Sequence, residues 1–333
     1  MILNDNSIIF HIDVNSAYLS WSALRELQNG SKLDLRTIPS IVGGDQETRH
    51  GIVVAKSIPA KAFGIQTAET VASAFQKCPT LVMVPPDHTY YREMSQKLMR
   101  HLRSICDEIE QVSIDECYMS FEPIRSQFPN PEAAAAYIKD SVYDTFGFTV
   151  NVGVSDRKVL AKMASDFKKP NLVHTLYVSE IQKKLWPLPI GSLHMCGKSS
   201  AKLLQKMGIR TIGDLAHTDK AVVESWLKSH GGMLWNYANG IDEGQVVKER
   251  PKAKGVGNST TLANNAETEE EAYAVLKELG NKCLSAPEKT SFSGSTDQHG
   301  DQICIFSFRI TPDNDTDTDS RGSGNLSVCL SAV

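Results

Sequence analysis

SIDECYMS, at residues 113–120, places two acidic residues, Asp115 and Glu116, side by side within a largely apolar run from Ile109 to Met119. The run predicts a short strand, or the turn of a hairpin, that reaches the surface at the two carboxylates. An isolated acidic pair is most often a solvated turn, because charged side chains are normally exposed. A cation site would need a third acid nearby, and the sequence offers Asp13.

Asp13 lies near the end of a second apolar run, IIFHIDV at residues 8–14, which has the pattern of a buried strand. Asn15 or Ser16 is expected to cap the helix AYLSWSALRELQN that follows, and Gly30 to close it. An acid at the end of a strand beside a helix start is a favoured cation or phosphate site. The alternative is that Asp13 only helps to cap the helix.

Length and composition are those of an ordinary globular protein. A chain of 333 residues with 41% hydrophobic and 22% charged residues allows two to three domains, each with its own core. The seven cysteines show no paired short spacing of the kind that holds zinc, and no signal peptide is recognisable, so reduced thiols in the cytoplasm are expected. No run approaches the ~18 apolar residues of a membrane span.

The net charge of −4 is unevenly distributed along the chain. From Leu284 onward seven acidic residues face three basic ones, which leaves the preceding residues neutral as a whole. Residues 180–260 hold twelve Lys and Arg against seven Asp and Glu. This segment is suited to face phosphates.

The order of predicted elements indicates an α+β fold. From Ile8 it reads strand, helix, insertion, helix, two strands, helix, strand, helix, which suits a ferredoxin-like sandwich. The later helices are expected over residues 88–109, over 131–146, and over a basic segment that Pro170 stops. Such a sheet brings the first strand beside the central hairpin, so Asp13 should face Asp115 and Glu116.

The flanking segments have weaker patterns. Residues 31–81 predict a small inserted subdomain in which Lys56 and Lys61 flank a Pro-containing turn, with a solvated loop as the alternative. From Ser179 the pattern changes to short helices, and MCGKSSAKLLQKMGIRTIGDL has the form of a helix-hairpin-helix, a form that also occurs without DNA. Residues 246–256 are basic and predict a tether.

Beyond the tether, GNSTTL and TEEEAYAVLKELGNK begin another α/β unit. From Leu284 the sequence is rich in Ser, Thr, Asp and Gly, which predicts disorder with only ICIFSFRI resembling a strand. A truncated or shifted reading frame would produce such a tail.

Five motifs together resemble the Y-family (translesion) DNA polymerases, and within them the bacterial DNA polymerase IV and V-like group. They extend to about residue 280 and comprise HIDVNSAYLS (11–20), AKSIPAKAFGIQT (55–67), SIDECYMS (113–120), NVGVSDRKVLAKMASDFKKPN (151–171) and the helical hairpin at 194–215.

The resemblance implies the shape of a right hand. It assigns a ferredoxin-like palm, a small fingers insertion, an all-α helix-hairpin-helix thumb, a linker and a partial α/β little finger. Their bounds are 1–30 and 82–177 for the palm, 31–81 for the fingers, 178–245 for the thumb, 246–256 for the linker, and 257–333 for the little finger with disorder after about 284.

The resemblance also implies that Asp13, Asp115 and Glu116 hold two Mg²⁺ ions, with the backbone carbonyl of Val14 as a further ligand. Mg²⁺ prefers hard oxygen ligands and keeps positions open for water and triphosphate oxygens, which agrees with a few carboxylates on rigid strands. Three acids so close should repel one another without metal, so Mg²⁺ is expected to raise the stability of the protein.

Further roles follow residue by residue. Tyr18 falls where the family places its sugar-discriminating aromatic, and Lys61 and Lys169 fall where it contacts the triphosphate. The family pattern has arginine where this chain has Lys61, and tyrosine where it has Ile58. Lysine lacks the bidentate fork and isoleucine donates no hydrogen bond, so lower nucleotide affinity is expected.

The hairpin is implied to bind DNA phosphates through Gly197, Lys198 and Lys202. Met195 replaces the first glycine of the usual turn. An incomplete little finger should weaken the affinity for DNA, because phosphate neutralisation supplies much of it.

The implied activity is template-directed, low-fidelity addition of deoxynucleotides to a primer, without proofreading. Primer-template DNA and deoxynucleoside triphosphates are the expected partners of a cytoplasmic monomer. A sliding clamp is a further candidate, although no clamp-binding peptide is visible at the C-terminus. The alternatives are a catalytically weak or inactive polymerase-like DNA-binding accessory protein and another two-metal nucleotidyl enzyme such as a cyclase.

Overall fold

The structure is a computed structural model that describes residues 7–44, 51–248, 255–262, 266, 268–284, 305–311 and 325–331. The chain divides into two compact units. Unit 1 comprises residues 1–42, 55–65 and 80–249, and unit 2 comprises 43–54, 66–79 and 250–333. Within the described ranges, no helix combines the length and the apolar character needed to cross a membrane.

Unit 1 is built on a five-stranded sheet with the strand order β5-β6-β1-β7-β8. The central strand β1 is antiparallel to both β6 and β7, and β7 is parallel to β8. The strands are β1 (Ile9–Val14), β5 (Ile109–Gln111), β6 (Glu116–Ser120), β7 (Val150–Ser155) and β8 (Val173–Thr175). The mixed α+β class and the pairing of the first strand with the central hairpin are as predicted.

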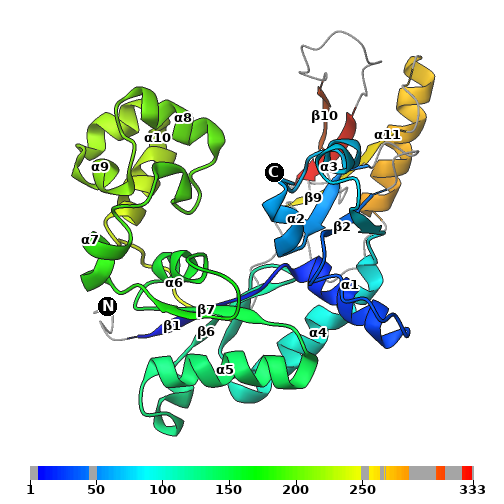
Figure 1. The fold of residues 1–333 in the computed structure, drawn as a ribbon. Coiled ribbons are helices and arrows are strands. Elements are labelled where there is room, and N and C mark those ends of the chain that lie inside the picture. Colours follow the sequence, from blue (N-terminus) through cyan, green and yellow to red (C-terminus); the bar gives the residue numbers. More distant parts are fainter. Residues whose placement is uncertain are drawn as a thin grey trace, which may run out of the picture. The chain divides into compact units, whose positions relative to one another are not determined.

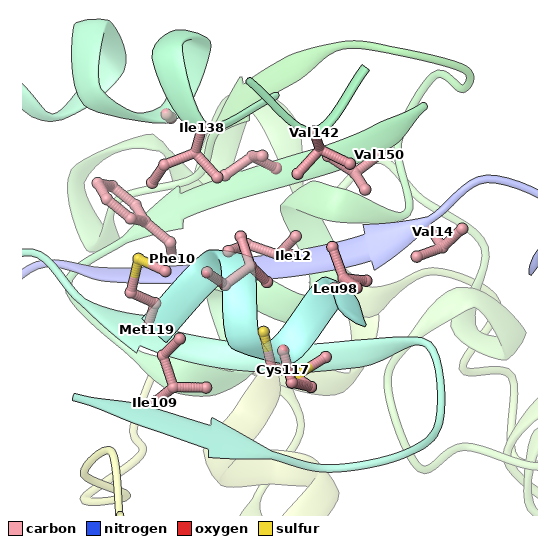
Figure 2. Packing of buried hydrophobic residues seen from close by; sticks show 14 of the residues in the cluster. Phe10, Ile12, Val14, Leu98, Ile109, Cys117, Met119, Ile138, Val142 and Val150 are labelled. Carbon is pink, nitrogen blue, oxygen red and sulfur yellow. The ribbon is translucent and has the colours of Figure 1, made fainter. Parts of the chain in front are cut away.

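One face of this sheet carries the main hydrophobic core. Helices α4 (His88–Ile105) and α5 (Pro131–Phe146) cover it, and α6 (Lys158–Ser165) lies on the other face (Figure 1). Figure 2 shows Phe10 and Ile12 of β1 among side chains from β6, β7, α4 and α5, all of which are buried. The core face thus fixes which side of β1 is available to α6.

The pleat of the sheet places alternate residues of β1 on opposite faces. Phe10, Ile12 and Val14 enter the core, so His11 and Asp13 face α6. This alternation is the reason that an apolar strand presents a carboxylate on one face only.

Helix α6 approaches the sheet closely because residue 153 of β7 is glycine. A Cβ at Gly153 would lie 2.0 Å from the Ala161 carbonyl oxygen and 2.5 Å from the Ser165 amide nitrogen, both of which are backbone atoms of the helix or its last turn. Gly153 is also the cross-strand partner of His11. Any larger residue would therefore push α6 away from the face that carries Asp13.

The remainder of unit 1 includes the short helices expected after Ser179. They share a second buried cluster with α6, which contains Leu160, Leu185, Leu204 and Leu234. The helices are α7 (Ile181–Lys184), α8 (Lys198–Lys206), α9 (Ile212–His217) and α10 (Lys220–Ala238).

The helix after β1 begins differently from the prediction. Ser16 precedes α1 (Ala17–Gln28) in a left-handed conformation, with φ of 49° and no side-chain hydrogen bond to the helix. The Asn15 side chain is engaged with other backbone and side-chain groups instead, so neither residue caps the helix with its side chain.

The inserted segment also contains more helix than expected. The predicted turn around Lys61 is the helix α2 (Ile58–Ala62), in which the Ser57 hydroxyl accepts a hydrogen bond from the Ala60 amide and a proline occupies the first turn. The other elements of this segment are β2 (Ser40–Gly43), β3 (Val53–Lys56), α3 (Val71–Lys77) and β4 (Val82–Val84).

Unit 2 contains an antiparallel sheet of order β10-β11-β9 and the helix α11 (Glu269–Leu284). The strands are β9 (Gly255–Thr261), β10 (Ile305–Thr311) and β11 (Asn325–Ser331). Strand β10 overlaps ICIFSFRI, the one segment after residue 284 predicted to resemble a strand. Strand β11 differs from the predicted disorder, and the reason is a period-two alternation of apolar residues in NLSVCLS. The expectation for the other residues beyond 284 lies outside the described residues.

A Gly153→Ala substitution should lower the free energy of unfolding by about 3 kcal/mol, because the added methyl meets backbone atoms that cannot rotate away. Urea denaturation measures this change. Gly191→Ala is the control, since its Cβ would meet only the Ala201 side chain at 3.6 Å, and it should cost less than about 1 kcal/mol. Equal costs for the two variants would show that α6 does not depend on Gly153.

Candidate active site

The two acidic segments meet at one end of the central strands. The register of β1 against β6 pairs Asp13 with Glu116, so both side chains project from the same face toward α6. The Val14 amide donates to the Asp115 carbonyl oxygen at 3.1 Å, which holds Asp115 beside the same strand end. The structure therefore brings the three predicted acids together.

Two lysines supply positive charge to this cluster. Lys162 of α6 places Nζ 2.8 Å from Glu116 Oε2 and 3.2 Å from Asp13 Oδ2. Lys169 places Nζ 3.1 Å from the other oxygen of Asp13. Lysines from the segment after β7 therefore reduce the expected repulsion between Asp13 and Glu116, and the effect of Mg²⁺ on stability stays a prediction.

A buried histidine of β1 contacts the cluster through Glu116. His11, 1% exposed, places Nε2 3.3 Å from Glu116 Oε2 and Nδ1 2.8 Å from the Ser165 hydroxyl. Burial lowers the pKa of His11, although its contact with Glu116 opposes that change. The imidazole thus lies between β6 and α6 and fixes one oxygen of Glu116.

The surroundings shift the pKa values of Glu116 and Asp115 in opposite directions. The hydrogen bond from His11, followed by the contact with Lys162, lowers the pKa of Glu116 to about 2. Burial raises the pKa of Asp115, and the charges of Asp13 and Glu116 raise it further, while a 2.6 Å hydrogen bond from the Ser113 hydroxyl opposes the change. Glu116 is therefore a firmly ionised group, whereas Asp115 gains from a cation placed between it and the other two acids.

The donor set fits a divalent cation. One atom each of His11, Asp13 and Glu116 lie within 4.8 Å of one another, and the charges of Asp13 and Glu116 act on the Asp115 carboxylate. Hard carboxylate oxygens on adjacent strands are ligands that Mg²⁺ prefers. These residues can therefore hold the ions that the resemblance implies.

The loop that carries Lys169 is fixed by two buried asparagines. Asn151, fully buried on β7, donates to the Ser165 and Lys168 carbonyl oxygens at 3.1 and 3.0 Å and accepts from the Leu172 amide at 3.2 Å. Asn15 donates to Asn151 at 3.2 Å and accepts from the Asn171 amide at 2.9 Å. These bonds hold the ends of the loop next to β1.

Tyr18 lies on α1 in an aromatic group. Its ring stacks on Tyr91 with centroids 4.8 Å apart and planes 25° apart, and it meets Trp21 edge-on. Burial raises the pKa of Tyr18, and the charge of Asp115 raises it further, so the phenol and this acid interact electrostatically. A stacked ring of this kind is a rigid wall beside the acids.

The other predicted residues lie on other elements of unit 1. Lys61 and Ile58 are exposed on α2. Gly197 is the N-cap of α8, and Lys198 and Lys202 are exposed on its first turns. The contacts described above join the acids to β1, β6, α6 and the following loop, and involve neither α2 nor α8.

Sequence reasoning missed Lys162, Asp166 and His11. Lys162, Asp166 and Lys169 are spaced by four and three residues, which is the spacing of one helical face, and Asp166 pairs with both lysines at 3.4 and 3.0 Å. His11 precedes Asp13 by two residues and so shares its face of the strand. Both spacings are visible in the sequence and could have identified these residues.

Comparison with known proteins agrees with this architecture. The impB/mucB/samB family matches residues 12–166. DNA polymerase IV of Clostridium acetobutylicum is 44% identical over 276 residues, which cover 82% of this chain and 69% of that protein. DNA polymerase IV 1 of Bacillus subtilis is 38% identical over 273 residues, covering 82% and 64% of the two chains.

A solved structure, a Y-family DNA polymerase chimera, is similar over 98% of this chain and 99% of its own with a TM-score of 0.78 and 22% identity. The chain therefore belongs to the Y family of DNA polymerases. Within that family, its relatives are the bacterial proteins named DNA polymerase IV.

An Asn151→Ala substitution should lower the free energy of unfolding by about 3 kcal/mol, because several buried backbone groups lose their partner. Hydrogen exchange at the Leu172 amide should also accelerate. Asn130→Ala removes only an exposed cap of α5 and should cost about 1 kcal/mol. Unchanged exchange at Leu172 would contradict the role of Asn151 in fixing the loop.

Proposed function

We propose that this protein is a translesion DNA polymerase that adds deoxynucleotides to a primer by template-directed nucleotidyl transfer, with low fidelity and no proofreading. The observation that carries the proposal is the convergence of Asp13, Asp115 and Glu116 at one end of β1 and β6 in a chain of this family. The comparisons support the polymerase class, and the roles of single residues rest on their geometry.

In this proposal Asp13, Asp115 and Glu116 would hold two Mg²⁺ ions, with the Val14 carbonyl as a further ligand. The bound ions would stabilise the charge on the attacking 3′-oxygen and on the pyrophosphate leaving group. The strands keep the acids in register, so that little reorganisation is needed when substrate binds.

Three side chains would position the nucleotide. The Lys169 ammonium would leave Asp13 and bind the triphosphate. Lys61, on α2 of the fingers, would also contact the triphosphate. Tyr18 would lie beneath the deoxyribose and exclude a 2′-hydroxyl. Lower nucleotide affinity, owing to Lys61 and Ile58, stays a prediction.

The domain assignment follows the family. Residues 1–30 and 82–177 would form the palm, 31–81 the fingers, 178–245 the thumb, 246–256 the linker and 257–333 the little finger.

The N-terminus of α8 at Gly197, with Lys198 and Lys202, would bind backbone phosphates of the primer-template, since helix amides point at such anions. We infer a cytoplasmic monomer; a clamp partner stays a prediction.

Replacing both Asp115 and Glu116 by Ala should reduce the rate of primer extension, measured with Mg²⁺ and the four deoxynucleotides, at least about a thousandfold. The reason is that metal ions supply several kcal/mol of transition-state stabilisation. Glu269→Ala/Glu270→Ala, an exposed acidic pair at the start of α11, is the matched control and should retain activity. Extension that survives loss of Asp115 and Glu116 would refute the metal assignment. Absence of extension by the wild-type protein would favour the accessory-protein alternative.

A Tyr18→Ala substitution should increase incorporation of ribonucleotides relative to deoxynucleotides by about ten- to a hundredfold, because the wall beneath the sugar is removed. Single-nucleotide insertion kinetics with matched ribo- and deoxynucleotides measure this ratio. Tyr18→Phe keeps the ring and should preserve discrimination. An unchanged ratio in Tyr18→Ala would place the sugar gate elsewhere.

A further inference from the structure

One lysine of the acid cluster has no part in the proposed chemistry. The ammonium of Lys162 bridges Glu116 at 2.8 Å and Asp13 at 3.2 Å, so it joins acids on two neighbouring strands. Its side chain is 14% exposed. Helix α6 fixes its position, because Gly153 allows the helix backbone to lie directly against the sheet.

This ammonium lies where a cation shared by Asp13 and Glu116 would lie. Carboxylates in direct cross-strand register repel one another unless positive charge lies between them. Lys162 provides that charge from within the chain, on the helix α6.

Lys169 differs from Lys162 in its exposure and in the number of acids on the strands that it contacts. It follows the helix, is 34% exposed, and contacts only Asp13 within the cluster besides Asp166. Lys169 is therefore suited to leave for a triphosphate. Lys162 is suited to stay.

We propose that Lys162 is a positioning residue that serves as the built-in counter-ion of the acid cluster and holds Asp13 and Glu116 together until divalent ions take over this role. The inference rests on the proposed function, because it assumes that these acids hold Mg²⁺. It predicts that loss of Lys162 makes the folded protein depend on Mg²⁺ for stability.

Thermal unfolding of Lys162→Met in EDTA and in millimolar Mg²⁺ tests this prediction, since methionine keeps the apolar stem and removes the charge. Lys158→Met is the matched control. Lys158 lies on the same helix, is 16% exposed and contacts Glu110 at 2.7 Å, away from Asp13 and Glu116.

In EDTA, the Tm of each variant should fall by about 5–10 °C, because each removes the lysine partner of a partly buried carboxylate. Mg²⁺ should raise the Tm of Lys158→Met only as much as it raises that of the wild type, whereas in Lys162→Met it should in addition restore at least about half of the loss. The wild-type protein should gain less from Mg²⁺ than Lys162→Met does. Lys162→Arg, which keeps the charge, should retain a Tm in EDTA close to that of the wild type.

Equal responses of Lys162→Met and Lys158→Met to Mg²⁺ would overturn the inference, as would an unchanged Tm of Lys162→Met in EDTA. If Lys162→Met does not fold, Lys162→Gln undergoes the same comparison. Primer extension by the wild-type protein distinguishes the two failures: extension without the Mg²⁺-dependent rescue refutes only the counter-ion role, whereas absence of both refutes the proposed function as well.

Discussion

The geometry of the site depends on charge compensation between one helix and the ends of two strands. Asp13 and Glu116 face each other across β1 and β6, and Lys162 of α6 lies between them. The approach of α6 is possible because Gly153 has no side chain. The distance between α6 and the sheet therefore controls both the backbone packing and the ionic contacts. If the helix lay farther from the sheet, the Lys162 ammonium would lose its contacts with both acids.

The same constraint explains why the third acid behaves differently. Asp115 follows the turn before β6 and accepts a hydrogen bond from Ser113, while its pKa is raised by burial and then by its acidic neighbours. Lys162 and Lys169 contact Asp13 and Glu116, which already have positive charge beside them. A cation that enters the site gains most beside Asp115, the acid whose charge also raises the pKa of Tyr18.

The sequence was sufficient to predict which strands pair and which acids meet. An apolar run identified β1, and the order of elements placed it beside the hairpin that carries Glu116. Spacing along the chain places Lys162 with Lys169 and His11 with Asp13. Whether these side chains reach the acids depends in addition on how closely α6 approaches the sheet, and a backbone contact at Gly153 sets that distance. The predicted side-chain cap of α1 was also wrong, because the Asn15 side chain accepts a hydrogen bond from the distant Asn171 amide instead.

Diffraction at the manganese absorption edge tests the assignment of the three acids most directly. The crystals would contain the protein with primer-template DNA, a non-hydrolysable deoxynucleoside triphosphate and Mn²⁺. Two anomalous peaks should lie among the carboxylates of Asp13, Asp115 and Glu116, with Lys169 moved from Asp13 to the triphosphate. Peaks that lie elsewhere, or a triphosphate bound away from these acids, would contradict the proposed active site.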